Sequence, residues 1–202
     1  MSQGMPTLES FVRAVAVPPF KERGWVRDKL RFRRPFGDGD AAVAEFRAYP
    51  SGRAPLEFHV DLGVVVAPHL EFVHRGRPVR GTPSTSHGLW QGRLTPPGQT
   101  PGGAWALDPE DAEAVAAFVA ALEARLDELG GIANRDVLLR LARERAALVD
   151  KSRSGILLPT PAVEALLLLG TGDMAGARAA AEELLGTDPD SPVAEWVLGK
   201  VR

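Results

Sequence analysis

Three titratable residues, Glu57, His59 and Asp61, occupy alternate positions of one segment of the chain. In a β-strand, alternate side chains project from the same face, so the carboxylates would flank the imidazole at intervals of about 7 Å. Such a group could perform acid–base chemistry. The same alternation is typical of the solvated face of an antiparallel sheet. We predict the solvated face and keep these three residues as binding candidates.

A second candidate is a basic segment between residues 21 and 34, which carries seven Lys or Arg side chains against two acidic ones. Aromatic residues lie among the cations, and we expect Trp25 at the surface. Cations interleaved with aromatic rings suit a nucleic-acid site, because they neutralise phosphates and stack on bases. The binding candidates in this segment are Arg23, Trp25, Arg27, Lys29, Arg31 and Arg33.

The charge distribution offers those cations a different partner. The net charge is −2, yet residues 1–100 carry 14 Lys and Arg against 9 Asp and Glu, whereas residues 101–202 carry 10 against 17. The two halves can therefore neutralise each other within one molecule. Arginine outnumbers lysine 20 to 4, a skew typical of a GC-rich genome. We predict intramolecular pairing or simple solvation for the basic segment, with nucleic-acid binding as the alternative.

No motif in the sequence indicates catalysis, a metal or a cofactor. The serines before His87 lack the nucleophile elbow of a hydrolase. The glycine-containing segments 37–40 and 170–173 lack the flanking pattern of a phosphate loop, so we expect both segments to be turns. The absence of cysteine excludes disulfides, thiolate ligands and a cysteine nucleophile. Metal-ligand spacing is absent among the four histidines, which are His59, His69, His74 and His87.

The strands that must position the candidates are defined by alternation. Residues 56–66 predict a central strand, whose core face would carry Leu56, Phe58, Val60, Leu62, Val64 and Val66. Strands at 29–36 and 41–48 form a hairpin, and short strands at 70–74 and 88–94 lie in a loop-rich stretch. The last of these carries Trp90 and Arg93, which we expect to be a packed aromatic ring and an ion-paired arginine, with a ligand clamp as the alternative.

Helices are predicted on both sides of these strands. An amphipathic helix covers 8–20 and stops at Pro18-Pro19. A longer helix covers 108–130, with Asp108 as its N-cap and Gly130-Gly131 at its end. Another helix runs from Asn134 to about residue 148.

These elements predict an α+β fold for residues 1–150, with an antiparallel sheet of four to five strands covered on one face by the helices at 8–20 and 108–130. The boundary lies at 151–155. Residues 151–202 match one tetratricopeptide-like helical hairpin plus a terminal helix, through Ala165, Leu168, Gly172, Ala177 and Pro189. One such repeat cannot bury its own face, so it must dock on the first domain or on another chain.

Residues 8–149 also resemble the bacterial domain-of-unknown-function family 4304. The resemblance rests on dispersed positions in the order that the family has, namely Gly24, Phe32, Asp61-Leu62-Gly63, Trp90, Arg93-Leu94 and Trp105. A polar segment that is usual in the second strand of the family is replaced by Ala44-Glu45-Phe46-Arg47. The resemblance implies a bacterial α+β domain and brings no established reaction.

We therefore expect a non-enzymatic interaction protein, of immunity or adaptor type, that binds another protein. The alternatives are a nucleic-acid-binding module that uses segment 21–34 and an enzyme of unrecognised class. No apolar run is long enough to cross a membrane, and no secretory signal opens the sequence, so we expect a cytoplasmic protein with no membrane contact. The oligomeric state is left open.

Overall fold

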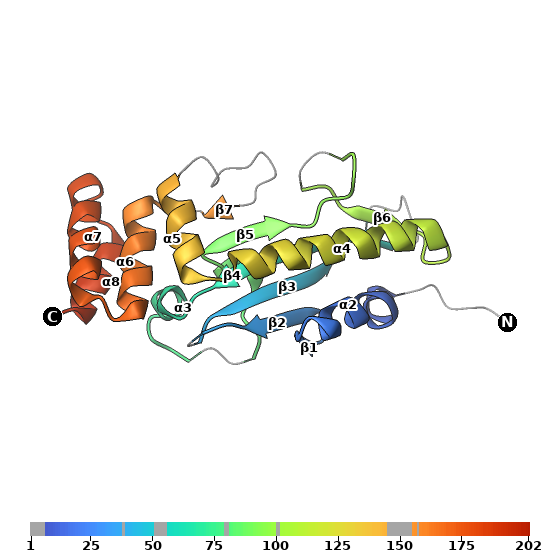
Figure 1. Ribbon diagram of the computed structural model, residues 1–202, viewed down its shortest axis with the longest axis horizontal. Coiled ribbons are helices and arrows are strands. Elements are labelled where there is room, and N and C mark those ends of the chain that lie inside the picture. Colours follow the sequence, from blue (N-terminus) through green and yellow to red (C-terminus); the bar gives the residue numbers. More distant parts are fainter. Residues whose placement is uncertain are drawn as a thin grey trace.

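The structure is a computed structural model that describes residues 7–37, 39–50, 56–78, 81–99, 102–144, 155–156 and 158–202. It is an elongated α+β fold, in which one antiparallel sheet is covered by helices and a group of C-terminal helices lies at one end (Figure 1). The α+β class and the antiparallel sheet predicted from the sequence are confirmed.

The sheet has seven strands. Six follow the order β1-β2-β3-β4-β5-β7, and β6 pairs with the first three residues of β4. Four of them match predicted strands: β2 (Arg31–Pro35), β3 (Ala41–Ala48), β4 (Leu56–Val65) and β5 (Trp90–Arg93). The sequence did not predict three short strands: β1 (Val26–Asp28), β6 (Trp105–Leu107) and β7 (Gly155–Ile156). Each of these has two or three residues, too few for an alternating pattern to stand out.

The core lies on the face of the sheet that the predicted register buries. The apolar residues of the central strand, Leu56, Phe58, Val60, Leu62, Val64 and Val66, are all at least 95% buried. Phe58 contacts the rings of Phe11 and Phe118, at 5.5 Å between ring centroids in both cases. These rings belong to the N-terminal helical segment and to α4 (Ala112–Ile132), so both predicted helices cover this face.

The N-terminal helical segment continues past the prolines that were expected to end it. It consists of α1 (Leu8–Phe11), a π-helical turn (Val12–Ala16) and α2 (Val17–Glu22). Pro18 and Pro19 lie in the first turn of α2, directly after the π-helical turn, in which the backbone N–H of Val17 donates to the carbonyl of Val12. The π-helical turn shifts the hydrogen-bond pattern just before them, so the chain stays helical.

The other predicted helix boundaries also shift, for local reasons. Helix α4 starts after Asp111, whose carboxylate accepts from two backbone N–H groups, and not after Asp108. It continues through Gly130-Gly131 to Ile132. Residues 70–74, expected as a strand, belong mostly to helix α3 (Ala67–Val73), where Pro68 occupies the first turn. A short apolar run fits either element, and here the proline at its start favours the helix.

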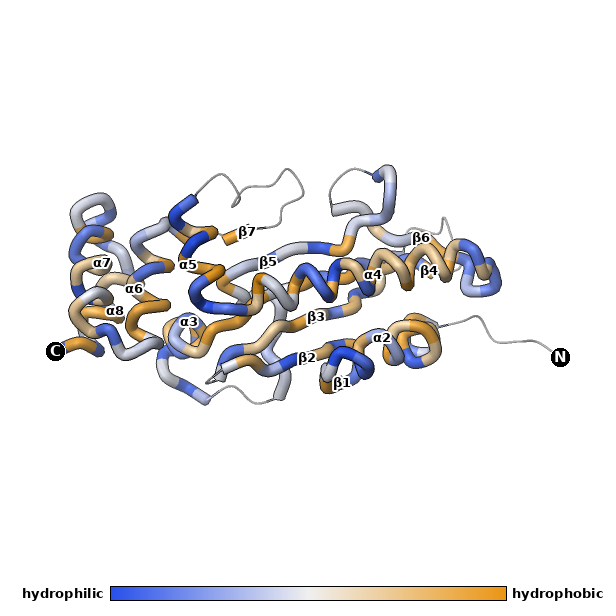
Figure 2. The backbone as a smooth tube through the Cα atoms, in the orientation of Figure 1, coloured by the Kyte–Doolittle hydropathy of each residue, from blue (hydrophilic) through white to orange (hydrophobic). Residues whose placement is uncertain are grey.

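The C-terminal helices dock on the rest of the same chain. They are α5 (Arg135–Glu144), α6 (Thr160–Thr171), α7 (Met174–Thr187) and α8 (Pro192–Lys200), and α6 contacts both α3 and α5. The hydrophobic stretch of α6 is visible in Figure 2. Gly170 allows the close approach to α3, because a Cβ there would lie 2.5 Å from Pro68 Cγ. Most of the predicted boundary at 151–155 lies outside the described residues, and β7, which begins at Gly155, pairs with β5.

A buried ion pair ties the sheet to these helices. Asp40, 2% exposed at the start of β3, accepts two hydrogen bonds from Arg135 of α5, at 2.6 and 2.8 Å. Asp40 Oδ1 also accepts from the backbone N–H of Ala67 at 2.9 Å, and Arg135 donates to the carbonyl of Gly170. One carboxylate thus joins β3, α3, α5 and, through Arg135, α6.

Candidate functional site

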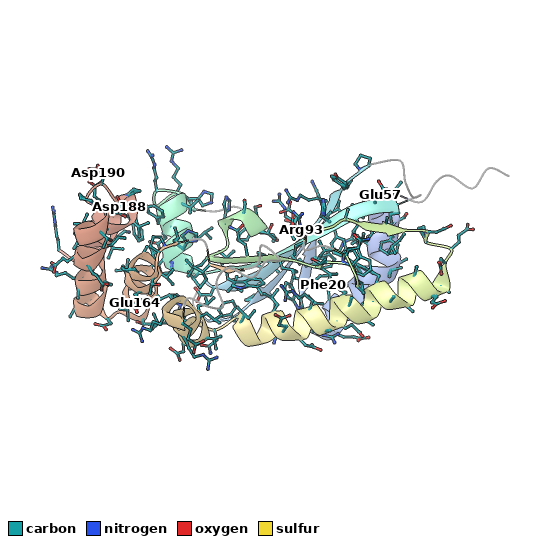
Figure 3. All side chains as sticks on the ribbon, turned by 90° about the horizontal axis from the view of Figure 1, so that it is seen from above. Phe20, Glu57, Arg93, Glu164, Asp188 and Asp190 are labelled. Atoms are coloured by element: carbon teal, nitrogen blue, oxygen red, sulfur yellow. The ribbon has the colours of Figure 1, made fainter. Side chains whose placement is uncertain are left out.

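The side of the sheet away from α4 carries a row of charges. The strand register places Arg31 of β2 beside Glu45 of β3, Glu45 beside Asp61 of β4, and Asp61 beside Arg93 of β5. In Figure 3, Arg93 lies on the side of the sheet away from α4 and Phe20 on the side that faces it. We name this surface the charged sheet face and define it as Arg31, Glu45, Arg47, His59, Asp61 and Arg93.

Asp61 is the most enclosed group of the charged sheet face. It is 6% exposed and lies between two arginines. Arg93 Nε donates to Asp61 Oδ1 at 2.7 Å, and Arg47 pairs with Oδ2. Arg93 is itself fixed by a second bond of 3.0 Å from Nη1 to the carbonyl of Gly102. The sequence prediction of an ion-paired arginine at position 93 is therefore confirmed.

Glu45 is held in a similar way on the neighbouring strand. Arg31 donates to Glu45 Oε1 through Nε at 3.1 Å and through Nη2 at 3.0 Å. The hydroxyl of Ser84 donates to Glu45 Oε2 at 3.2 Å. The arginine remains accessible, since 42% of its side chain is exposed, compared with 13% for Glu45. The carboxylate is thus satisfied while part of the guanidinium still faces solvent.

An aromatic pair extends the charged sheet face at the end of β3. The rings of Tyr49 and His59 lie 4.7 Å apart, and Tyr49 is 52% exposed. The pKa of His59 is lowered, first by burial and then by the positive charge of Arg93. The neutral form of His59 is therefore favoured, and its ring lies against Tyr49 in the positive field of Arg93 and Arg47.

Glu57, His59 and Asp61 share one face of β4 as predicted, but that face is not simply solvated. Glu57 and Asp61 are 8% and 6% exposed. Asp61 is bound by arginines rather than by His59, so it does not orient the imidazole for proton transfer. Among the hydrogen bonds of the described residues, no serine or threonine hydroxyl bonds to a histidine ring, so no nucleophile–base pair is formed.

Part of the basic segment is paired within the molecule, as the charge asymmetry predicts. Arg23 Nε donates to Asp127 Oδ1 at 2.7 Å, and Arg23 Nη1 lies 3.6 Å from Glu123. This pairing with α4 raises the pKa of Arg23 and lowers that of Asp127. Arg27 donates to the backbone carbonyl of Lys29. Lys29 has a positive φ of 56°, and its side chain is exposed. Together with the Arg31–Glu45 pair, these contacts leave no continuous row of free cations.

The two tryptophans proposed as binding residues are core residues. Trp25, expected at the surface, is only 6% exposed and packs edge-on against Phe20 at 5.2 Å. The helix α2 continues far enough to place Phe20 over the start of β1, which buries the indole. Trp90 is 4% exposed, in agreement with the packed-aromatic prediction, and Arg125 lies 5.5 Å above its ring.

The fold brings together three histidines that are separate in the sequence, His69, His74 and His87. His74 Nε2 and His87 Nδ1 are 3.4 Å apart. Burial lowers the pKa of His87, and so does the nearby His74; His69, 8% exposed, has its pKa lowered mainly by burial. Within the described part of the chain, no three His, Asp or Glu side chains are grouped in a way that could hold a metal ion. No local pattern in the sequence indicates this cluster, because it joins α3 and the residue after it to the 3-10 turn Thr85–His87.

None of the described helices combines the length and the apolar character needed to cross a membrane.

The chain matches no family model, no curated protein and no solved structure. The resemblance to family 4304 stays a prediction.

Proposed function

We propose that this chain is a non-catalytic binding protein that takes a protein partner on the charged sheet face. One observation carries the proposal: Arg31 and Arg47 are 42% and 56% exposed while each holds a carboxylate, and the half-exposed Tyr49 lies against His59, the cross-strand neighbour of Arg47. Arginine and tyrosine are enriched at protein interfaces and among the residues that dominate binding energy. Both arginines stand on a sheet, so their positions are largely fixed before binding, which reduces the entropy cost.

The chemistry of the charged sheet face specifies the partner. Glu45 and Asp61 already accept hydrogen bonds from arginines of the same chain. The groups left to bind a partner are therefore guanidinium donors and the ring of Tyr49. An acidic protein surface with an apolar contact for Tyr49 would satisfy them.

We also propose the origin and location of the protein, its general type and the kind of hairpin that α6 and α7 form. The protein is of bacterial origin and acts in the cytoplasm, as the resemblance and the composition imply. It is of immunity or adaptor type, since the family that it resembles brings no established reaction and the C-terminal hairpin is of a partner-binding kind. The α6–α7 hairpin is tetratricopeptide-like, an architecture that serves partner binding elsewhere.

The test is a comparison of affinities with a purified partner. A partner captured from the source organism would be titrated against the full chain, against the double variant Arg47→Ala/Tyr49→Ala, and against the control Arg140→Ala, which changes an exposed arginine of α5. Two central interface residues at about 2 kcal/mol each predict a loss of about 10³-fold for the double variant. The control should bind as the unchanged protein does.

Two results would refute the proposal. One is a partner whose affinity is the same for the double variant and for the control. The other is micromolar binding to DNA or RNA with a steep salt dependence, which would move the basic segment into first place. We expect no nucleic-acid binding at physiological salt, because Arg23 and Arg31 already pair with carboxylates.

A further inference from the structure

A cleft of about 760 Å³ lies on the same side of the sheet as the charged sheet face, beyond Arg31 along β2. Its described walls come from β2 and residues 37 and 39–41, from α3, from residues 76–78, 81 and 83, and from the end of α8. The charged side chains that line it are Arg33, Asp40, Glu71, Arg77 and Lys200. Its volume is within the range of small-molecule sites, about 300 to 1,000 Å³.

Among the described residues that line this cleft, the positive charges exceed the negative ones that remain available. Asp40 is already neutralised by Arg135, which lies outside the cleft lining. Glu71 lies 3.5 Å from Lys200, and both are about half exposed. Among the described residues, no carboxylate lies within ion-pair distance of Arg33 or Arg77. Two guanidinium charges in the lining therefore have no counter-charge from the part of the chain that the structure describes.

Arg33 also has an unsatisfied donor. Its Nε is buried and has no hydrogen-bond partner, although the residue as a whole is half-buried. A buried N–H that makes no hydrogen bond is costly, so a shift of the Arg33 side chain that let a ligand oxygen reach this group would remove that cost. Arg77 is exposed, so the cleft opens to solvent on the side of this second guanidinium.

The number of free charges decides between anions. A single carboxylate would neutralise only one of the two arginines. A phosphate monoester carries about −1.5 to −2 charges at pH 7 and has three strong acceptor oxygens, so it matches both. Arginine is also the side chain best suited to bind phosphate through two parallel hydrogen bonds.

We infer that this cleft binds the phosphate group of a small organic phosphate, up to the size of a nucleotide, between Arg33 and Arg77. The inference is independent of the proposed protein-binding function, because neither arginine belongs to the charged sheet face. Lys200, which the last helix contributes to the same cleft, is paired with Glu71 and adds no further free charge. The rest of the ligand would occupy the remaining volume of the cleft.

The experiment is isothermal titration calorimetry with the full chain at low salt. The probes are inorganic phosphate, a nucleoside monophosphate, a sugar monophosphate and citrate. We expect at least one of the two organic monophosphates to bind more tightly than inorganic phosphate and citrate. Whichever binds tighter shows whether the ligand is a nucleotide or a sugar phosphate.

Arg33→Gln and Arg77→Gln should each weaken that binding about tenfold or more, as expected for the loss of charge-assisted hydrogen bonds. Arg140→Gln, which removes an exposed arginine outside the cleft, should leave it unchanged. If Arg33→Gln does not fold, the exposed Arg77→Gln decides alone.

Three results would overturn the inference. The first is the absence of saturable binding by all three phosphates up to about 10 mM. The second is citrate binding as tight as that of the organic monophosphates. The third is binding that survives Arg77→Gln as well as it survives Arg140→Gln.

Discussion

Replacement of Asp40 by alanine tests whether one carboxylate joins the sheet to the C-terminal helices. The change removes the carboxylate that accepts two hydrogen bonds from Arg135, a side chain only 18% exposed, and removes the acceptor of the Ala67 N–H. Loss of one partner of a buried ion pair costs about 3 to 5 kcal/mol. Arg135 keeps its bond to the carbonyl of Gly170, so we take the middle of that range, about 4 kcal/mol, for the loss in free energy of unfolding.

The loss can be measured by denaturant unfolding monitored through tryptophan fluorescence. In a chain of this size about 4 kcal/mol corresponds to a fall in Tm of roughly 8 to 16 °C. The matched control is Glu164→Ala, which breaks the pair that Glu164 forms with the 58%-exposed Arg143 of α5. An ion pair with one exposed partner contributes about 1 kcal/mol or less, so the control should unfold close to the unchanged protein.

A double variant makes the prediction sharper. If the cost of Asp40→Ala comes from an uncompensated charge, Arg135→Ala added to it should cost little more, or even restore stability. Equal, small effects of Asp40→Ala and Glu164→Ala would refute the reasoning. Additive losses for Asp40→Ala and Arg135→Ala would refute it as well, because they would mean that the two side chains act separately.

Three further predictions concern the core, a helix contact and pH. Val60→Asp should abolish soluble folding, because it places a carboxylate in the fully buried face of β4; an unchanged Tm would contradict the strand assignment. Gly170→Ala should lower the Tm because its Cβ would collide with α3, whereas Gly186→Ala in α7, which meets no atom within 4 Å, should raise stability by about 0.5 to 1 kcal/mol. Burial lowers the pKa of His69 and His87 in the folded state. Below the ordinary pKa of histidine, the unfolded chain therefore binds more protons at these two rings than the folded protein does. The unfolding free energy should therefore fall as pH drops from 7 to 5, and the double variant His69→Gln/His87→Gln should show a smaller fall.

Long periodic segments were predictable because their pattern reports burial directly. The alternation at 56–66 identified β4 and its core face, and the stripe of apolar residues near Phe118 identified α4. The short strands β6 and β7 were not predictable in the same way. They are strands because β4 and β5 offer them hydrogen-bonding edges, and that depends on the tertiary structure rather than on their own residues.

The candidate site could be predicted only in part, for a similar reason. That Glu57, His59 and Asp61 share a face follows from their spacing along one strand. That Asp61 lies beside Arg93 depends on the register between β4 and β5, which no local pattern specifies. Trp25 was expected at the surface because its neighbours are basic, whereas its burial depends on where helix α2 ends.

The pairing of β7 with β5 has a consequence for synthesis on the ribosome. The edge of β5 that Gly155 and Ile156 cover is made long before those residues are, with α4 and α5 translated in between. Until β7 arrives, the nascent chain carries an unpaired strand edge next to Trp90, and such edges recruit strands from other molecules. Protein truncated after residue 150 lacks β7 and would keep that edge unpaired. It should therefore aggregate during expression, whether or not α6, α7 and α8 take part in partner binding.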